Sequence, residues 1–317
     1  MKPSSLSHSV SEKIIETFIH LSAAVSIVGL VLIFIFIGKE SLPVFTSPEI
    51  RREASLSKIF LPQSPEPGEE KVFRWQPVSV VPKYSLLPLV VGTLKATAVA
   101  LLFAIPLALA AALFTSEFAP SWLREWVKPV IELLAGIPSV VMGFFALIVM
   151  ATYVQELFGL DFRLNAISAG IALGLAVVPV VYTMAEDALS AVPQSYREGS
   201  IALGATPWQT AWRVVLPAAF PGIFAACILG LGRAIGETMI VLMASGNAAV
   251  SSWSPTDPFR SLSATIAAEM GEVVRGSTHY HVLFFIGVLL FLFTFFINYL
   301  GQLFVERLRQ KLSGTDK

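Results

Sequence analysis

The hydrophobic positions of this chain fall in long, nearly uninterrupted runs. Runs of about 18 or more apolar residues with few charges predict transmembrane helices. Six runs have this character: Phe18–Gly38, Leu86–Phe114, Val130–Val154, Ala166–Ala185, Ala218–Ala244 and Val282–Val305. The charged residues inside them are Lys95, Glu132, Arg233 and Glu237. The pattern predicts an all-α membrane protein whose chain crosses the lipid bilayer six times.

Composition supports this prediction and excludes several other classes. Hydrophobic residues make up 55% of the 317 and charged residues 14%, whereas a soluble domain carries about 25% charge. The net charge is zero, which gives no reason to expect a nucleic-acid partner. The single cysteine, Cys227, lies in the fifth run, so no intrachain disulfide is expected. The pair His279 and His281 is expected to be a polar entry to the sixth run rather than a metal site.

The connections between the runs differ in length and composition. The first run is too long for a signal peptide and lacks a cleavage site after it, so we expect an uncleaved helix. The segment 39–85 is rich in proline and mixed charges and is predicted to be an extramembrane loop, partly extended. Lysine and arginine are equally divided between the two sides of the predicted topology, so they do not orient the chain.

The loop before the fifth run predicts a helical hairpin. Gln194 to Leu203 is expected to form a first helix, and Gly204 suits the left-handed conformation that ends one. Thr206 is a candidate N-cap of a second helix, with a capping box closed by Gln209. From these residues alone, the hairpin could be an inert connection or a docking element.

This loop, REGSIALGATPWQTAWRVVLP, resembles the signature of bacterial ATP-binding-cassette importer permeases. Family members show Glu-Ala-Ala, three residues, Gly, nine residues and then Ile-x-Leu-Pro. The matching residues here are Glu198, Gly199, Ser200, Gly204, Leu216 and Pro217. Gly199 and Ser200 replace the two alanines and are also small. The resemblance implies that these six residues belong to a cytoplasmic coupling helix docked on an ATPase subunit, which would place both termini inside and 39–85 outside.

Two further stretches resemble the first permease subunit of high-affinity phosphate importers. They are FTSEFAPSWLREWVKPVIELLAGIPSVVMGF and LGLGRAIGETMIVLMASGN. The resemblance implies three parts: an N-terminal helix with an external loop (1–85), a permease core of five transmembrane helices (86–310) and a cytoplasmic tail (311–317). The chain has no G-x-x-x-x-G-K-[ST] motif, so ATP is expected to bind a partner ATPase, with no cofactor in this chain.

The charges Arg233 and Glu237 lie in the fifth run, where a charge is costly. Because they are four residues apart, they are expected to share one helix face and to pair. Gly232 and Gly236 form a small-x-x-x-small stripe beside them. The pair either fixes helix packing or lines a substrate path. In the second case, Glu237 would hold Arg233 while the path is empty and release it as phosphate passes; the resemblance points to the same two residues.

The remaining polar and small residues of the runs are expected to be structural. Lys95 is expected to extend toward an interface and Glu132 to lie near the cytoplasmic end of the third run. Gly170 and Gly174 suggest a packing stripe. Prolines inside the runs are expected to cause kinks or to free backbone carbonyls: Pro88, Pro106, Pro138 and Pro179.

Together with the six spans, the resemblance implies a six-span permease with the type I importer fold in a bacterial inner membrane. The resemblance implies a second permease subunit, an ABC ATPase dimer and an external phosphate-binding protein as partners. The chain itself would be a transport subunit without catalytic residues or metal ligands. The alternatives are a permease of the same fold for sulfate, molybdate or phosphonate, and a membrane channel or sensor that works without ATP. An intramembrane enzyme is disfavoured because no nucleophile–base or metal-ligand constellation occurs.

Overall fold

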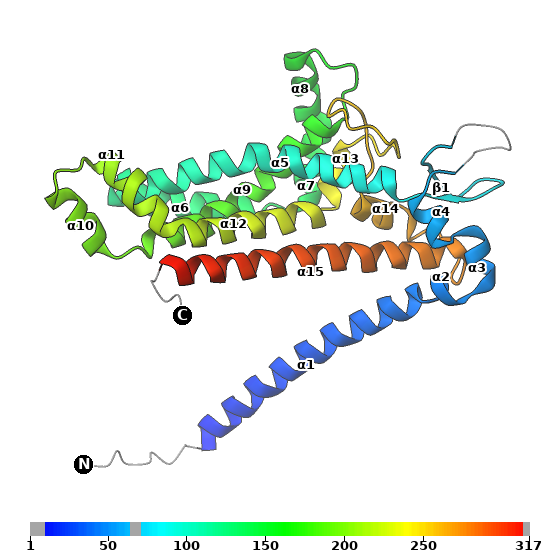
Figure 1. The fold of residues 1–317 in the computed structure, drawn as a ribbon, viewed down its shortest axis with the longest axis horizontal. Coiled ribbons are helices and arrows are strands. Elements are labelled where there is room, and N and C mark those ends of the chain that lie inside the picture. The colour runs from blue at the N-terminus through cyan, green and yellow to red at the C-terminus, as the bar shows by residue number, and fades with distance from the viewer. Residues whose placement is uncertain (1–9, 64–70, 313–317) are drawn as a thin grey trace.

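Most of the long helices lie side by side in one elongated bundle, and the first long helix diverges from it toward its N-terminal end (Figure 1). The computed structural model describes residues 10–63 and 71–312. The long helices are α1 (Val10–Ser41), α5 (Leu87–Leu113), α9 (Ala166–Ser190), α12 (Leu216–Gly236) and α15 (Thr278–Leu312). Six helical segments of the described residues are long and apolar enough to cross a membrane: Glu12–Thr46, Leu87–Phe118, Ser139–Phe158, Ala166–Ser190, Pro207–Gly236 and Thr278–Leu308. The six predicted spans are therefore confirmed, although their bounds differ from the predicted ones, most of all in the third and fifth spans.

The third span begins later than predicted. Residues 121–158 form α6 (Ser121–Ala135), α7 (Ser139–Phe145), the π-helical turn η2 (Ala146–Met150) and α8 (Ala151–Phe158). Pro138 is the N-cap of α7, with φ −58° and ψ 137°. A proline lacks the N–H that would continue the preceding helix and disfavours helical backbone at the residue before it, so α6 ends before Pro138. Glu132 consequently lies in the amphipathic helix α6, outside the third span.

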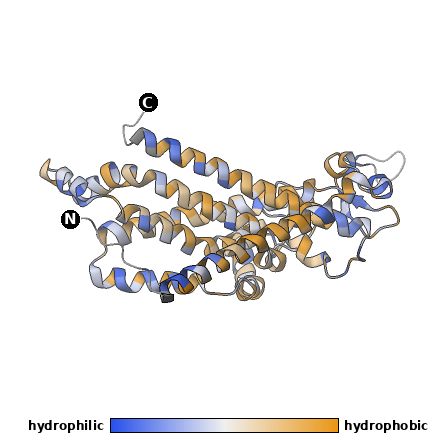
Figure 2. Ribbon diagram, turned by 90° about the horizontal axis from the view of Figure 1, so that it is seen from below, coloured by the Kyte–Doolittle hydropathy of each residue, from blue (hydrophilic) through white to orange (hydrophobic). Residues whose placement is uncertain are grey.

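Shorter elements occupy the two ends of the bundle. One end, called the α10 end, holds α10 (Gln194–Ala202) and α11 (Pro207–Thr210). The π-helical turns η1 (Phe114–Phe118) and η3 (Ala211–Val215) belong to the same end. In Figure 1, α1 begins and α15 ends toward this end. Figure 2 shows hydrophobic residues along the long helices and hydrophilic residues gathered at the two ends.

The opposite end, called the β1 end, contains most of the loop 39–85. That loop is more ordered than predicted. It forms α2 (Pro43–Thr46), α3 (Pro48–Glu53), α4 (Leu56–Phe60) and the antiparallel strands β1 (Trp75–Gln76) and β2 (Lys83–Tyr84). Its buried residues pack on the first turns of α5 and α15. The proline-rich stretch 64–70 of this loop, which was predicted to be partly extended as a whole, lies outside the described residues. The two remaining helices, α13 (Met239–Ala244) and α14 (Leu262–Glu269), lie between α12 and α15 in the sequence.

The core of the bundle is the contact between α5 and α9. A row of alanines four residues apart on α5 is almost completely buried: Ala96, Ala100, Ala104, Ala108 and Ala112. On α9, a Cβ at Gly170 would lie 2.5 Å from Val99, and one at Gly174 would lie 2.8 Å from Phe103. The predicted packing stripe is confirmed, because small residues on both helices allow their backbones to approach closely.

We expect Gly170→Leu to destabilise the protein by about 1–3 kcal/mol, because a larger side chain there overpacks the contact between α5 and α9. Thermal unfolding of the purified protein measures this. Gly29→Leu is the matched control, since a Cβ at Gly29 on α1 meets nothing within 4 Å. Equal unfolding temperatures for the two variants would contradict the packing role.

Candidate functional site

The predicted helical hairpin is confirmed in detail. α10 is followed by Gly204, whose φ of 86° lies in the left-handed region that favours glycine. Thr206 then caps α11: its hydroxyl accepts from the Gln209 N–H at 3.2 Å, and the Gln209 side chain accepts from the Thr206 N–H at 2.9 Å. The helix continues from Pro207 to Gly236 through η3. The hairpin is therefore rigidly continuous with the fifth span.

The residues of the permease signature occupy different positions on this hairpin. Glu198 and Gly199 are exposed on α10, and a Cβ at Gly199 would meet nothing within 4 Å. Ser200 faces the second helix, where its hydroxyl lies 3.0 Å from that of Thr210. Leu216 is the first residue of α12 and packs against the core, whereas Pro217 is exposed. Close packing within this chain therefore explains why Ser200 is small. Gly199 faces outward, so close packing within this chain does not explain it.

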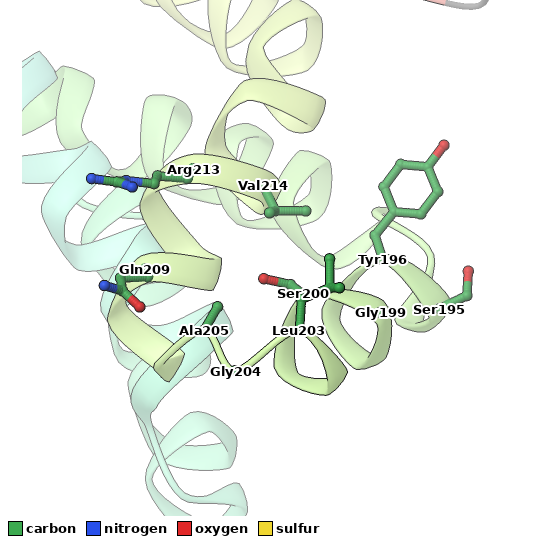
Figure 3. A pocket seen from close by; sticks show the side chains of 10 residues that line it. All are labelled: Ser195, Tyr196, Gly199, Ser200, Leu203, Gly204, Ala205, Gln209, Arg213 and Val214. Carbon is green, nitrogen blue, oxygen red and sulfur yellow. The ribbon is translucent and has the colours of Figure 1, made fainter.

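A groove of about 580 Å³ lies between the two helices of the hairpin (Figure 3). It is lined by Ser195, Tyr196, Gly199, Ser200, Leu203, Gly204, Ala205, Gln209, Arg213 and Val214. Apolar side chains project from the hairpin: Leu203 is 91% exposed, Trp208 58% and Ile201 54%. The hairpin thus exposes apolar side chains among polar ones, which makes it a candidate interaction surface.

One arginine of the hairpin has a role that the spacing did not reveal. Arg197 forms an ion pair with Glu117 of η1 at 2.7 Å, and both side chains are mostly buried. In the sequence, Arg197 is only one of the lysines and arginines divided between the two sides of the predicted topology. Its partner lies 80 residues away in the chain, so no local pattern could predict the pair.

The structure corrects the expected geometry of Arg233 and Glu237. α12 ends at Gly236, and Glu237 has an extended backbone with φ −69° and ψ 133°. The two residues therefore do not share a helix face. The break is stabilised by the hydroxyl of Ser263 on α14, which donates to the Glu237 carbonyl at 2.8 Å.

No ion pair joins Arg233 and Glu237, although the structure describes both residues. Arg233 is exposed, and its Nε donates to the Ala176 carbonyl of α9 at 3.4 Å. Pro179, nearby on α9, lacks the N–H that the Leu175 carbonyl would accept in a regular helix. Glu237 is half-buried, and its carboxylate accepts from the Thr238 N–H at 3.1 Å. It remains a prediction that Glu237 holds Arg233 while the path is empty and releases it as phosphate passes.

The two glycines beside this pair have different surroundings. A Cβ at Gly232 would lie 3.3 Å from the side chain of Asn298 on α15, so this glycine permits close approach of the two helices. A Cβ at Gly236 would meet nothing within 4 Å. Only the first glycine acts as a packing position within this chain.

Lys95 does not extend to an interface as predicted. Its side chain is 4% exposed, and its ammonium group donates to the carbonyls of Ser252 and Ser254 at 3.1 and 2.8 Å. The same group lies 5.6 Å from the centre of the Phe259 ring. Lys95 thus ties α5 to the loop after α13, because a buried ammonium group needs acceptors in place of water.

A second polar cluster lies at the β1 end. Glu269 of α14 accepts from Trp75 at 3.1 Å, lies 2.8 Å from His279 and forms an ion pair with Arg260. His279, at the start of the sixth span, is thus a polar entry as predicted, and no group of three or more His, Cys, Asp or Glu among the described residues could hold a metal. Burial acts to raise the pKa of Glu269, but the hydrogen bonds from His279 and Trp75 and the charge of Arg260 outweigh it and lower this pKa.

We expect this cluster to stabilise the protein above the ordinary glutamate pKa of about 4.3 and to lose its effect as the pH falls through the lower pKa in the folded state. The measurement is the unfolding temperature of the wild type and of Glu269→Gln as a function of pH. Their difference should be largest near neutral pH and should shrink in acid. Because all other carboxylates titrate in both proteins, a difference that is constant with pH would contradict the role of Glu269.

Comparison with known proteins agrees with this architecture. Residues 104–312 match the family described as binding-protein-dependent transport system inner membrane component. The chain is 39% identical over 232 residues to the probable ABC transporter permease protein YqgH of Bacillus subtilis, which covers 72% of this chain and 75% of that protein. It is 34% identical over 256 residues to the phosphate transport system permease protein PstC of Xylella fastidiosa, which covers 75% and 78%.

Solved structures show the same fold. The MetNI methionine ABC transporter in an inward-facing conformation matches with a TM-score of 0.56 and 24% identity, over 70% of this chain and 95% of that chain. A bacterial alginate ABC transporter in complex with its pentasaccharide-bound periplasmic protein matches with a TM-score of 0.58 and 16% identity, over 92% and 95%. The predicted type I importer permease fold is confirmed. The chain belongs to the family of inner membrane components of binding-protein-dependent transport systems.

Proposed function

We propose that the chain is a transmembrane permease subunit of an ATP-driven inorganic phosphate importer and forms half of its translocation path. Its likeness to phosphate transport permeases, which extends over about three quarters of the chain, supports this substrate. The observation that carries the proposal is the exposed Arg233, held near the end of a membrane-spanning helix.

Arginine suits a phosphate path for two physical reasons. Its planar guanidinium donates two parallel hydrogen bonds to one phosphate, and it stays charged after losing water. Within the described residues, Arg233 makes one long hydrogen bond, to a backbone carbonyl. A guanidinium with further donors available is ready to bind an anion, whereas one with all donors satisfied would only hold helices together.

The position of Arg233 on α12 favours a path between two subunits. Leu229, Arg233 and Gly236 lie on one face of the helix and are exposed in the single chain. Charged residues within a membrane span face a cavity or a protein surface, because hydrocarbon is too costly for them. A second permease subunit would cover this face and enclose the path. Glu237, at the helix break next to it, is the second proposed path residue.

The hairpin supplies the proposed connection to ATP. Its exposed apolar surface fits a cleft in an ABC ATPase subunit, and a dimer of such ATPases would serve both permeases. ATP would bind there, because this chain carries no phosphate-binding loop of the G-x-x-x-x-G-K-[ST] type. The α10 end and both termini would then face the cytoplasm of a bacterial cell. The β1 end would face an external phosphate-binding protein.

The alternative with the most support is a permease of the same fold for another oxyanion. An arginine in the path would also bind sulfate, molybdate or a phosphonate, since all are tetrahedral anions. The selectivity of uptake therefore decides between them.

The test is uptake of labelled phosphate into vesicles that contain the whole complex, with sulfate and molybdate as competitors. We expect ATP-dependent uptake that unlabelled phosphate inhibits and the other two anions leave unchanged. Inhibition by sulfate or molybdate would favour the other oxyanion. Phosphate flux in vesicles that lack the ATPase would instead support an ATP-independent channel.

A further inference from the structure

The Arg197–Glu117 ion pair connects the hairpin to the transmembrane helices. The Nε of Arg197 donates to one carboxylate oxygen of Glu117 at 3.1 Å, and its NH2 donates to the other at 2.7 Å. The side chains are 15% and 8% exposed. A two-pronged contact between a guanidinium and a carboxylate fixes direction as well as distance, so it resists rotation of α10 relative to η1.

The same guanidinium also holds the end of α9. Its NH1 donates to the Val192 carbonyl at 2.6 Å and its NH2 to the Leu189 carbonyl at 3.0 Å. These carbonyls belong to the last turn of α9 and the residues after it, where the regular i→i+4 helical bonds end; the Leu189 carbonyl also accepts from the Val192 N–H at 3.3 Å. A positive charge is favoured at a helix C-terminus. One side chain of the hairpin thus bonds to the ends of two transmembrane segments.

Glu117 is itself held firmly in place. It lies in η1, the π-helical turn that continues α5, and π-helical turns in α-helices often occur at functional sites. The hydroxyl of Ser116 donates to its carboxylate at 3.0 Å. Arg124 of α6 donates to the Thr115 carbonyl at 3.0 Å and to that of Ser116. A displacement of Arg197 is therefore passed to the backbone of η1 rather than absorbed by a mobile side chain.

The helices that receive this displacement are tightly joined. α5 and α9 pack along the row of buried alanines and against Gly170 and Gly174. Because packed interiors have little free space, such a pair moves as a unit. Halfway along α9, the Ala176 carbonyl accepts from Arg233. The contacts are therefore continuous from Arg197, through α9, to Arg233, the first of the two proposed path residues.

We propose that the Arg197–Glu117 ion pair is the link through which movement of the ATPase-bound hairpin is transmitted to α5 and α9. This rests on the proposed function, since it assumes that the hairpin docks on an ATPase. Arg197 and Glu117 are positioning residues: they touch neither ATP nor phosphate, and they determine whether hydrolysis moves the path.

The test is the number of ATP molecules hydrolysed per phosphate taken up, measured in proteoliposomes with the whole complex and the phosphate-binding protein. We expect Arg197→Gln and Glu117→Gln to raise this ratio at least several-fold while ATP hydrolysis continues. Arg197→Lys, which keeps the charge without the fork, should give an intermediate ratio. Complexes are first checked for full subunit content.

Lys128→Met is the matched control. It breaks a neighbouring interaction at the same end, in which Lys128 of α6 lies 2.9 Å from Glu186 and 3.1 Å from Asp187 on α9, but it leaves α10 untouched. If the glutamine variants acted only through a general loss of stability, Lys128→Met would also raise the number of ATP molecules hydrolysed per phosphate. We expect Lys128→Met instead to keep the wild-type ratio.

Three outcomes would overturn the inference. The first is a wild-type ratio of ATP to phosphate in both glutamine variants, and the second, should those variants fail to assemble, is a wild-type ratio in Arg197→Lys. The third is a rise of this ratio in Lys128→Met that equals the rise in the glutamine variants. Failure of the wild-type complex to transport phosphate would instead contradict the proposed function, so the two failures are distinguishable.

Discussion

Replacing Arg233 by glutamine is expected to reduce phosphate uptake at least about 100-fold, while the complex assembles normally. Loss of a charge-assisted, two-pronged contact with an anion in a low-dielectric path removes about 3 kcal/mol or more, and each 1.4 kcal/mol corresponds to a factor of ten. Arg233→Lys keeps the charge but loses the fork, so we expect it to retain partial uptake. The measurement is ATP-dependent uptake of labelled phosphate into vesicles that contain the whole complex.

The competing explanation is that Arg233 only fastens α12 to α9 through the Ala176 carbonyl. In that case, uptake would fall in proportion to the amount of assembled complex. Phe220→Gln is the control, because it changes an exposed position of α12 that lies off the face of Leu229, Arg233 and Gly236. Near-normal uptake by assembled complexes with Arg233→Gln and with Glu237→Gln would rule out a path role for both residues.

The hairpin was predictable because local chemistry determines it. Three features act within a few residues of one another: a glycine that ends one helix, a threonine that caps the next, and a glutamine three residues later. The structure contains all three features. The six spans were predictable for a similar reason, since hydrocarbon requires about 20 apolar residues per helix whatever the neighbours do.

Apart from the start of the third span, which a local proline determines, the errors arose where contacts between distant residues decide the geometry. Hydropathy cannot show that Ser263 bonds to the Glu237 carbonyl and replaces a helical bond there. The same limit applies to Lys95, whose acceptors lie more than 150 residues away in the chain. The buried pair of Arg197 and Glu117 also joins segments that are unrelated in sequence. Tertiary contacts decide each of these cases, and a single sequence contains no periodicity that reports them.

Leu203→Glu is expected to prevent the permease from binding its ATPase. Leu203 is 91% exposed and lies beside the groove of the hairpin, where an apolar side chain has no purpose in the isolated chain. A central anchor of a protein interface contributes about 2 kcal/mol or more, which corresponds to a loss of affinity of about 30-fold. The introduced carboxylate would also be buried without a partner, which weakens binding further. Co-purification of the ATPase with the permease measures the effect.

Val80→Glu is the matched control for this experiment. Val80 is a highly exposed aliphatic residue like Leu203, at 103% against 91%, but it lies between β1 and β2 at the opposite end of the bundle, far from the hairpin (Figure 1). A charge there should leave the ATPase bound. If Leu203→Glu retains its ATPase as firmly as Val80→Glu does, the apolar surface of the hairpin is not the docking site, and the connection between ATP and Arg233 must run through another part of the α10 end.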